Sequence, residues 1–130
     1  MQLWNNAGAS FRFKETAGAG NDIDAYDNGS WNGWIALTWT SPILAGSSLS
    51  SARVVINLHY EWDPPHPTVV ATDASGAFDL YTAVAHELGH TLHLGEDTSG
   101  KRTMMHPKIR PAESRSLDPD DIAGIQFLYP

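Results

Sequence analysis

The sequence contains no cysteine, and this absence removes several kinds of chemistry at once. The protein can form no disulfide, offers no thiolate to a metal ion and has no thiol nucleophile. A chain of 130 residues is nevertheless long enough to bury a hydrophobic core without covalent cross-links. We therefore expect a single domain whose stability comes from packing.

Basic residues are also scarce, because eight Lys and Arg stand against fifteen Asp and Glu and leave a net charge of −7. A chain with this charge is not expected to bind nucleic acid, and a soluble monomer is favoured. No apolar run approaches the roughly 18 residues of a membrane-spanning helix. The first residues do not have the pattern of a signal peptide either. From the charge and the short apolar runs together, neither a nucleic acid nor a membrane is expected as a partner.

The most informative segment is H-E-L-G-H at residues 86–90. On an α-helix, His86 and His90 lie one turn apart on the same side, so both imidazoles can reach one metal ion. Glu87 lies beside them and can take a proton from a water activated by that ion, as in H-E-x-x-H zinc peptidases. We expect the helix to cover residues 79–93 and to end near Gly95. Its opposite side carries an apolar residue at every fourth position: Leu80, Val84, Leu88 and Leu92.

The rest of the chain alternates between strand patterns and turns. Alternation of apolar and polar residues predicts strands at 10–14, 21–26, 34–39 and 53–60, and the last is β-branched enough to be central. Residues 3–9 resemble the end of a helix that stops at Gly8. Asp118 as N-cap, Pro119 in the first turn and Asp121 predict a final helix over residues 118–129. We assign these aspartates to helix capping and not to catalysis.

Three further groups of residues are weaker candidates for binding sites. Asp22, Asp24 and Asp27 lie close together and could hold calcium through oxygen ligands, but without a bounded loop pattern a solvated face is favoured. His59 and His66 lack the ligand spacing of a second metal site. The tryptophans of the strands are assigned to core and rim packing in preference to a sugar-stacking surface.

Four blocks of the chain, in order, resemble the metzincin metallopeptidases, and within that clan the matrixins. They are residues 78–90, the Met-turn at 103–107, the segment 117–129 and, more weakly, 35–39. The resemblance implies an α+β fold in which a twisted mixed β-sheet and an active-site helix form an upper subdomain, about residues 1–94. A small C-terminal subdomain, about residues 95–130, would end in a helix. A first strand and most of a first helix would precede Trp4, and the protein would be extracellular or secreted.

Two positions depart from the family pattern H-E-x-x-H-x-x-G-x-x-H. His93 stands where the pattern has Gly, which turns the backbone with positive φ. Since His enters that region more readily than most residues, the turn either survives at His93 or moves to Gly95. Glu96 stands where the family has its third ligand, His or sometimes Asp, so the resemblance implies Glu96 as the third zinc ligand. Asp97, which needs a shifted turn, and His93, which lies almost two turns from His86, remain alternatives.

The resemblance also implies roles for residues outside the helix. Met105 would form an apolar floor beneath the metal ligands, and the loop 108–116 would border the pocket for the side chain that follows the scissile bond. A polypeptide substrate would lie in the cleft between the subdomains and pair with four residues of an edge strand: Ile35, Ala36, Leu37 and Thr38.

The expected function is therefore that of a zinc endopeptidase with one catalytic Zn²⁺ and Glu87 as general base. The alternative is a zinc-binding, catalytically weak module that holds polypeptides in its cleft. That alternative follows from an anionic third ligand, because a carboxylate donates more charge than imidazole and makes the zinc less Lewis acidic.

Overall fold

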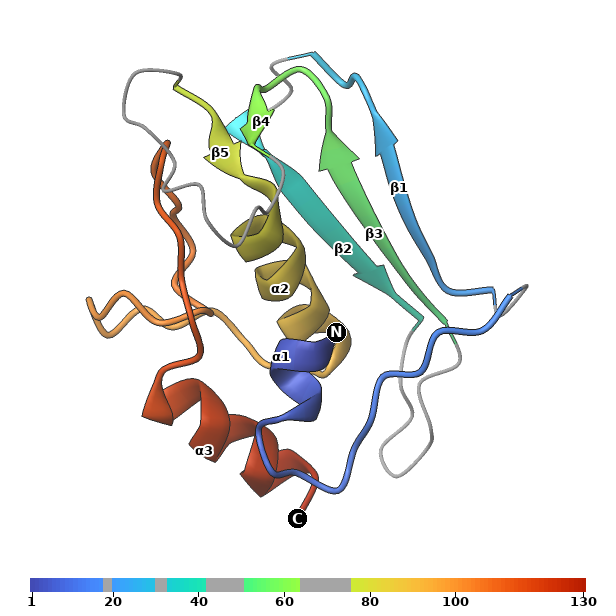
Figure 1. The fold of residues 1–130 in the computed structure, drawn as a ribbon, viewed down its shortest axis with the longest axis vertical. Helices are drawn as coiled ribbons and strands as arrows, with labels where there is room; N and C mark the ends of the chain where they lie inside the picture. Colours follow the sequence, from blue (N-terminus) through green and yellow to red (C-terminus); the bar gives the residue numbers. More distant parts are fainter. Residues whose placement is uncertain (18–19, 30–32, 42–50, 64–75) are drawn as a thin grey trace.

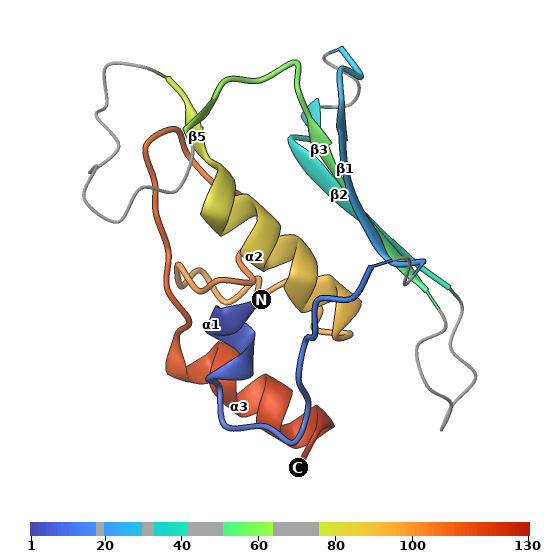
Figure 2. The ribbon, with the colours of Figure 1, turned by 45° about the vertical axis from the view of Figure 1, so that its right-hand side comes forward.

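The computed structural model describes residues 1–17, 20–29, 33–41, 51–63 and 76–130. The candidate metal ligand His66 lies outside these ranges. Figures 1 and 2 show a sheet on one side of a long central helix, with two further helices below that helix on the side away from the sheet. No helix within the described ranges is long and apolar enough to cross a membrane.

The sheet has three strands, β1 (Asp22–Tyr26), β2 (Ala36–Thr40) and β3 (Ala52–Asn57), in the order β1-β3-β2. β3 is parallel to β1 and antiparallel to β2, with Ile23 opposite Val54 and Leu37 opposite Val55. The prediction of a central, β-branched strand is confirmed, and β2 lies at the edge of this sheet. At the end of β3, the side-chain amide of Asn57 donates to the carbonyls of Gly29 and Trp34.

The strand predicted at 10–14 is wrong, since this segment has no regular secondary structure. Its backbone is held by a side chain instead, because the Asn5 amide donates to Phe13 O at 2.9 Å and Asn5 Oδ1 accepts from Phe13 N at 2.6 Å. Phe11 and Phe13 both pack against the core, which explains their alternation. Two short parallel strands, β4 (Trp62–Asp63) and β5 (Phe78–Asp79), were not predicted because two residues show no period.

The described residues form three helices, α1 (Gln2–Asn5), α2 (Leu80–Thr91) and α3 (Pro119–Leu128). Asp79 caps α2 by accepting from Thr82 N, and Asp118 with Asp121 forms a capping box at α3. Leu88 and Leu92 of the predicted apolar stripe are buried, whereas Leu80 and Val84 are only partly so. The core lies between α2 and the two shorter helices and is centred on four large buried residues: Trp4, Met104, Met105 and Ile125.

Candidate metal centre and active site

A cleft of about 470 Å³ lies between β2 and α2. Residues 33–38 form one wall, so the predicted substrate-contacting residues Ile35, Ala36, Leu37 and Thr38 all line it. The floor comes from α2, with His86, Glu87 and His90. The other wall is formed by the chain between α2 and α3, which contributes five lining residues: Glu96, His106, Pro107, Ile109 and Arg115.

His86, His90 and Glu96 meet at the floor of this cleft. The two Nε2 atoms are 3.1 Å apart, and the Glu96 carboxylate oxygens lie 3.7 Å from His86 Nε2 and 3.5 Å from His90 Nε2. One ligand atom of each residue lies within 4.8 Å of the other two, and no other such group of three occurs among the described residues. Two imidazoles and one carboxylate at these separations could hold a single metal ion.

Backbone carbonyls orient both imidazoles toward this group. His86 Nδ1 lies 2.8 Å from Met104 O, and His90 Nδ1 lies 2.9 Å from Leu94 O. Because a carbonyl oxygen only accepts hydrogen bonds, each Nδ1 must carry the proton. Each Nε2 is therefore left with its lone pair facing Glu96, which is the tautomer needed to bind a metal.

A turn at His93 delivers Glu96 to the histidines. α2 ends at Thr91, and His93 then takes a φ of +66°, while Leu94 N donates to Gly89 O at 3.1 Å. The prediction that the turn survives at His93 is confirmed, and the alternative turn at Gly95 is wrong because Gly95 is not among the residues of positive φ. The side chain of His93 is exposed and lies outside the group of three.

Asp97 also lies outside that group and is bound within its own loop. Its carboxylate accepts hydrogen bonds from Ser99 N at 2.8 Å and from Thr103 Oγ1 at 2.7 Å. Hydrogen bonds from Ser99, with that from Thr103, lower the pKa of Asp97 to about 2. Its backbone N donates to Met105 O at 2.8 Å, so Asp97 ties the Glu96 loop to the Met-turn.

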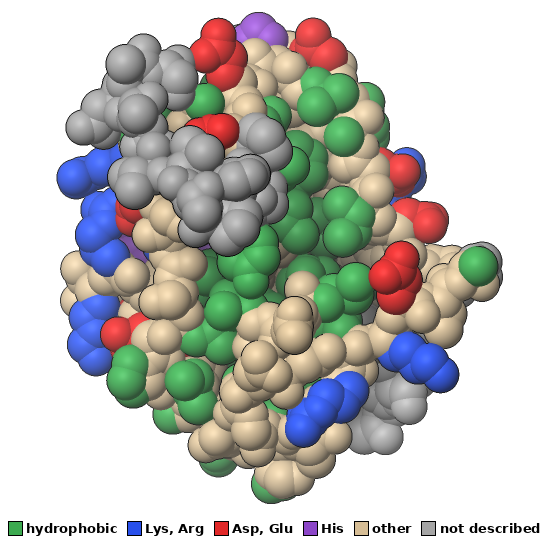
Figure 3. Space-filling view, in the orientation of Figure 1, with side chains coloured by type: hydrophobic (Ala, Val, Ile, Leu, Met, Phe, Trp, Pro, Cys, Tyr) green, Lys and Arg blue, Asp and Glu red, His purple; other side chains and the backbone are tan. Residues whose placement is uncertain are grey.

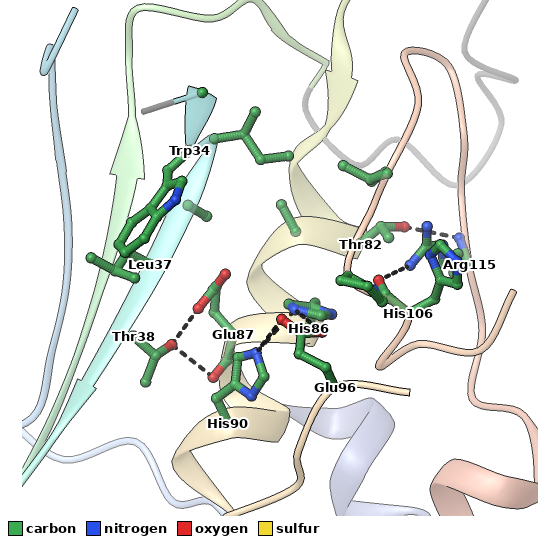
Figure 4. A pocket seen from close by; sticks show the side chains of 16 residues that line it. Trp34, Leu37, Thr38, Thr82, His86, Glu87, His90, Glu96, His106 and Arg115 are labelled. Atoms are coloured by element: carbon green, nitrogen blue, oxygen red, sulfur yellow. Dashed lines mark hydrogen bonds and ion pairs between the residues drawn. The ribbon is translucent and has the colours of Figure 1, made fainter. Parts of the chain in front are cut away.

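Glu87 is buried beside the histidines, with 6% of its surface exposed. Thr38 Oγ1 donates to Glu87 Oε2 at 2.5 Å and lies 3.0 Å from the Glu87 carbonyl oxygen (Figure 4). Burial raises the pKa of the Glu87 carboxyl, and the hydrogen bond from Thr38 opposes that rise. The sequence placed Thr38 only on the substrate strand. Thr38 carries the one hydroxyl in the otherwise apolar stretch from Ile35 to Trp39, and this isolated hydroxyl is the sequence feature that could have indicated a role beyond substrate contact.

Met105 lies directly beneath the helix that carries the histidines. A Cβ at Gly89 would overlap Met105 Sδ and lie 3.0 Å from Trp4 Cζ2, so only glycine lets the Met-turn approach so closely. The turn is fixed from below by Asp121, whose carboxylate accepts from Met104 N at 2.9 Å and from Met105 N at 3.1 Å. Sequence reasoning assigned Asp121 only to capping, because these contacts join segments 16 and 17 residues apart.

Arg115 was missed altogether, although it holds the wall opposite β2. Its guanidinium donates to His106 O at 2.8 Å and Thr103 O at 3.2 Å, to Lys108 O, and to Glu113 Oε1 at 2.8 Å. Its backbone N donates to Thr82 Oγ1 of α2 at 2.9 Å. No local pattern marks such a residue, because all of its acceptors are defined by the folded loop.

Within the described ranges, the remaining candidates do not form a second group of metal ligands. Asp24 forms an ion pair with Arg53 at 2.6 Å, and Asp27 accepts from Gly29 N and lies 3.6 Å from the exposed ring of His59. Two of the three candidate calcium ligands, Asp24 and Asp27, are thus engaged with other partners.

The chain is similar to several known metalloendoproteinases. Metalloendoproteinase 1 of Glycine max is 42% identical over 62 residues, which are 47% of this chain and 20% of that protein. Metalloendoproteinase 1-MMP of Arabidopsis thaliana is 36% identical over 87 residues, 63% of this chain and 24% of that protein. Neutrophil collagenase of Homo sapiens is 38% identical over 60 residues, 45% and 13% respectively.

The matched segments thus span a quarter or less of the length of these relatives. A model of the matrixin family, in contrast, matches residues 1–130. The predicted metzincin α+β fold is thereby confirmed, and the mixed sheet with its helices agrees with it. Since the family match covers the whole chain, this protein belongs to the matrixins, a family of zinc-dependent metallopeptidases.

Proposed function

We propose that the protein is a zinc endopeptidase that hydrolyses peptide bonds in the cleft between β2 and α2. The observation that carries this proposal is the meeting of two correctly oriented imidazoles and the Glu96 carboxylate beside the buried Glu87. Matrixins are typically secreted, and we propose the same location for this protein.

The residues at the floor of the cleft fit a zinc ion. Imidazole nitrogen and carboxylate oxygen are both ordinary zinc donors, and three protein ligands leave a coordination position open, as catalytic zinc sites require. We assign His86, His90 and Glu96 as these ligands. A bound zinc ion supplies a Lewis acid, which polarises the peptide carbonyl and makes water more acidic.

The side chains around the metal ligands divide the remaining tasks. Glu87 accepts the proton of the attacking water at a carboxylate oxygen and returns it to the leaving amine. Thr38 holds that carboxylate toward the cleft through the hydrogen bond to Oε2. The edge of β2 that faces away from β3 offers backbone groups to an extended substrate. The loop 108–116 borders the space for the side chain after the scissile bond.

Metal content and peptidase activity, measured together, test this proposal. We expect about one zinc per chain after reconstitution, and casein cleavage that a chelator abolishes. Glu87→Ala should keep the zinc and the fold but lose at least about 10²- to 10⁴-fold in kcat, the usual effect of removing a general base. Glu15→Ala, which removes an exposed carboxylate from the segment before β1, is the matched control.

Two outcomes would contradict the proposal. Folded, zinc-loaded protein that cleaves no polypeptide would support the alternative function, a catalytically weak binding module. Membership of a peptidase family does not favour that alternative. Protein that binds no zinc after reconstitution would exclude both functions.

A further inference from the structure

The cationic residues of this acidic protein are concentrated in one segment. Residues 101–115, here called the basic loop, contain five of the eight Lys and Arg residues and one of the fifteen acidic residues. The rest of the chain therefore has three cationic and fourteen acidic side chains. Lys and Arg side chains gather along the left edge in Figure 3, where Figure 1 places the chain between α2 and α3. The five cations are Lys101, Arg102, Lys108, Arg110 and Arg115.

The basic loop forms one wall of the active-site cleft. His106, Pro107, Ile109 and Arg115 line the cleft, and the exposed Lys108 and Arg110 flank these lining residues. The opposite wall is neutral, because residues 33–41 contain no Asp, Glu, Lys or Arg. Of the two walls that the structure describes, only the basic loop therefore carries cationic side chains.

The charge of the basic loop is only partly neutralised. Its single carboxylate, Glu113, is shared between Arg102 and Arg115. Lys108 and Arg110 form no ion pair with any residue that the structure describes. Among the described residues, no carboxylate therefore neutralises these two side chains, and we expect both to attract a negative charge on a bound polypeptide.

Arg115 is fixed in the wall of the cleft opposite β2. Its side chain is 4% exposed and is held by four acceptors, so the guanidinium cannot swing away. A guanidinium has five N–H donors, which leaves one on Nη2. Figure 4 shows Arg115 beside His106 and Thr82, at the end of the cleft away from β2.

We infer that this peptidase selects polypeptides with an acidic side chain directly after the scissile bond. The inference rests on the proposed function and adds a substrate class to it. Arg115 and the rim cations Lys108 and Arg110 attract the substrate carboxylate, whereas the neutral β2 wall binds the substrate backbone without regard to charge. Selection by partly exposed charges acts mainly on substrate capture and weakens as salt is added.

A series of quenched fluorescent peptides that differ at one position tests this inference. The residue after the scissile bond is Glu, Gln or Leu, and a fourth peptide carries its Glu three residues before that bond. We expect kcat/KM for the first peptide to exceed that for its Gln counterpart by about three- to tenfold at low salt. The advantage should shrink as the Debye length falls from about 30 Å to about 3 Å, and the fourth peptide should show little of it.

Arg110→Gln and a matched control locate the effect in the basic loop. Arg110→Gln should reduce the Glu-to-Gln ratio of kcat/KM. Lys14→Gln makes the same change of charge on the segment before β1, outside the cleft, and should leave the ratio unchanged. Fluorescence anisotropy titrations with the zinc-loaded Glu87→Ala variant measure the affinity for the labelled Glu and Gln peptides. They compare the two peptides without cleavage.

Failure of this inference can be told apart from failure of the proposed function. If the Leu peptide is cleaved but the Glu peptide is no better, the inference is overturned while the peptidase stands. Equal effects of Arg110→Gln and Lys14→Gln would also overturn it, since net charge alone would then be responsible. If no peptide is cleaved and Glu87→Ala binds all of them equally, both proposals fail.

Discussion

Glu96 reaches the metal group from a more solvated position than either histidine. Its side chain is 43% exposed, against 14% for His86 and 25% for His90. A ligand that arrives from the surface can be removed without opening a cavity, so its substitution tests metal binding more cleanly than substitution of a histidine. It also brings a negative charge, which strengthens the attraction for a divalent cation.

Glu96→Ala should therefore weaken zinc binding by more than the about 10- to 100-fold seen when an outer hydrogen-bond partner of a metal ligand is lost. Competition with a chromophoric chelator measures the affinity, and circular dichroism checks the fold. Asp97→Asn should leave the affinity within a few-fold, because Asp97 is engaged with Ser99 and Thr103. The reverse order of the two effects would assign the third ligand to Asp97.

His93 adopts a left-handed backbone conformation in the turn that brings Glu96 to the two histidines. At a φ of +66°, a β-branched residue is strained and glycine is not. His93→Val should lower the free energy of unfolding by about 1–2 kcal/mol relative to His93→Gly. Urea unfolding of the zinc-free proteins measures this difference, and the same substitutions at the exposed Thr98, which has no positive φ, serve as the control. Equal stability of the two His93 variants would show that the turn does not need positive φ.

At the level of elements, the start of α3 supports the metal site. Asp121 is 5% exposed and accepts from three backbone N–H groups, those of Met104, Met105 and Asp118. The first of these residues also orients His86 through its carbonyl oxygen. A helix cap thus holds the floor of the active site in place.

Asp121→Ala should destabilise the fold by about 2–4 kcal/mol, because it loses a cap and leaves buried donors unsatisfied. Asp118→Ala removes the acceptor for Asp120 N at the same helix and should cost only about 1 kcal/mol. Chemical denaturation of both variants tests the difference. Zinc affinity should fall in Asp121→Ala but not in Asp118→Ala. An equal fall in the two variants would show that zinc affinity depends on the helix cap and not on support of the Met-turn.

The elements differ in how far their sequence predicts them. α2, α3 and β3 follow from local signals: apolar spacing, N-cap residues and a β-branched run. The segment around Phe11 and Phe13 carries the same alternation as a strand, yet a side chain of α1 satisfies its backbone. The contacts of Thr38 with Glu87, of Asp121 with the Met-turn and of Arg115 with Thr103 could not be predicted from sequence. Each joins residues that only the fold brings together.

For the whole molecule, the basic loop makes stability depend on pH. Burial raises the pKa of the Glu113 carboxyl, but hydrogen bonds from Arg102 and Arg115 and from Arg110 N outweigh it and hold the pKa at about 2. Since the ordinary value is 4.5, the folded state binds this proton more weakly than the unfolded state. The stabilisation is complete above pH 4.5 and is lost as the pH falls toward 2.

We therefore expect Glu113→Gln to be less stable than the unsubstituted protein near neutral pH and equally stable near pH 2. Thermal unfolding of both proteins across this range measures the difference. A gap in melting temperature that is independent of pH would show that shape, and not the charge of Glu113, joins the two arginines.

The closeness of Met105 to Gly89 limits how this molecule can be engineered or can evolve toward heat resistance. Replacing a helical glycine with alanine usually adds about 1 kcal/mol of helix stability. That route is closed in α2, because Met105 and Trp4 occupy the space a methyl group would need. Gly89 therefore stays between His86 and His90, and we expect a metal ion bound to both imidazoles to hold this glycine-containing turn of α2 in its helical conformation.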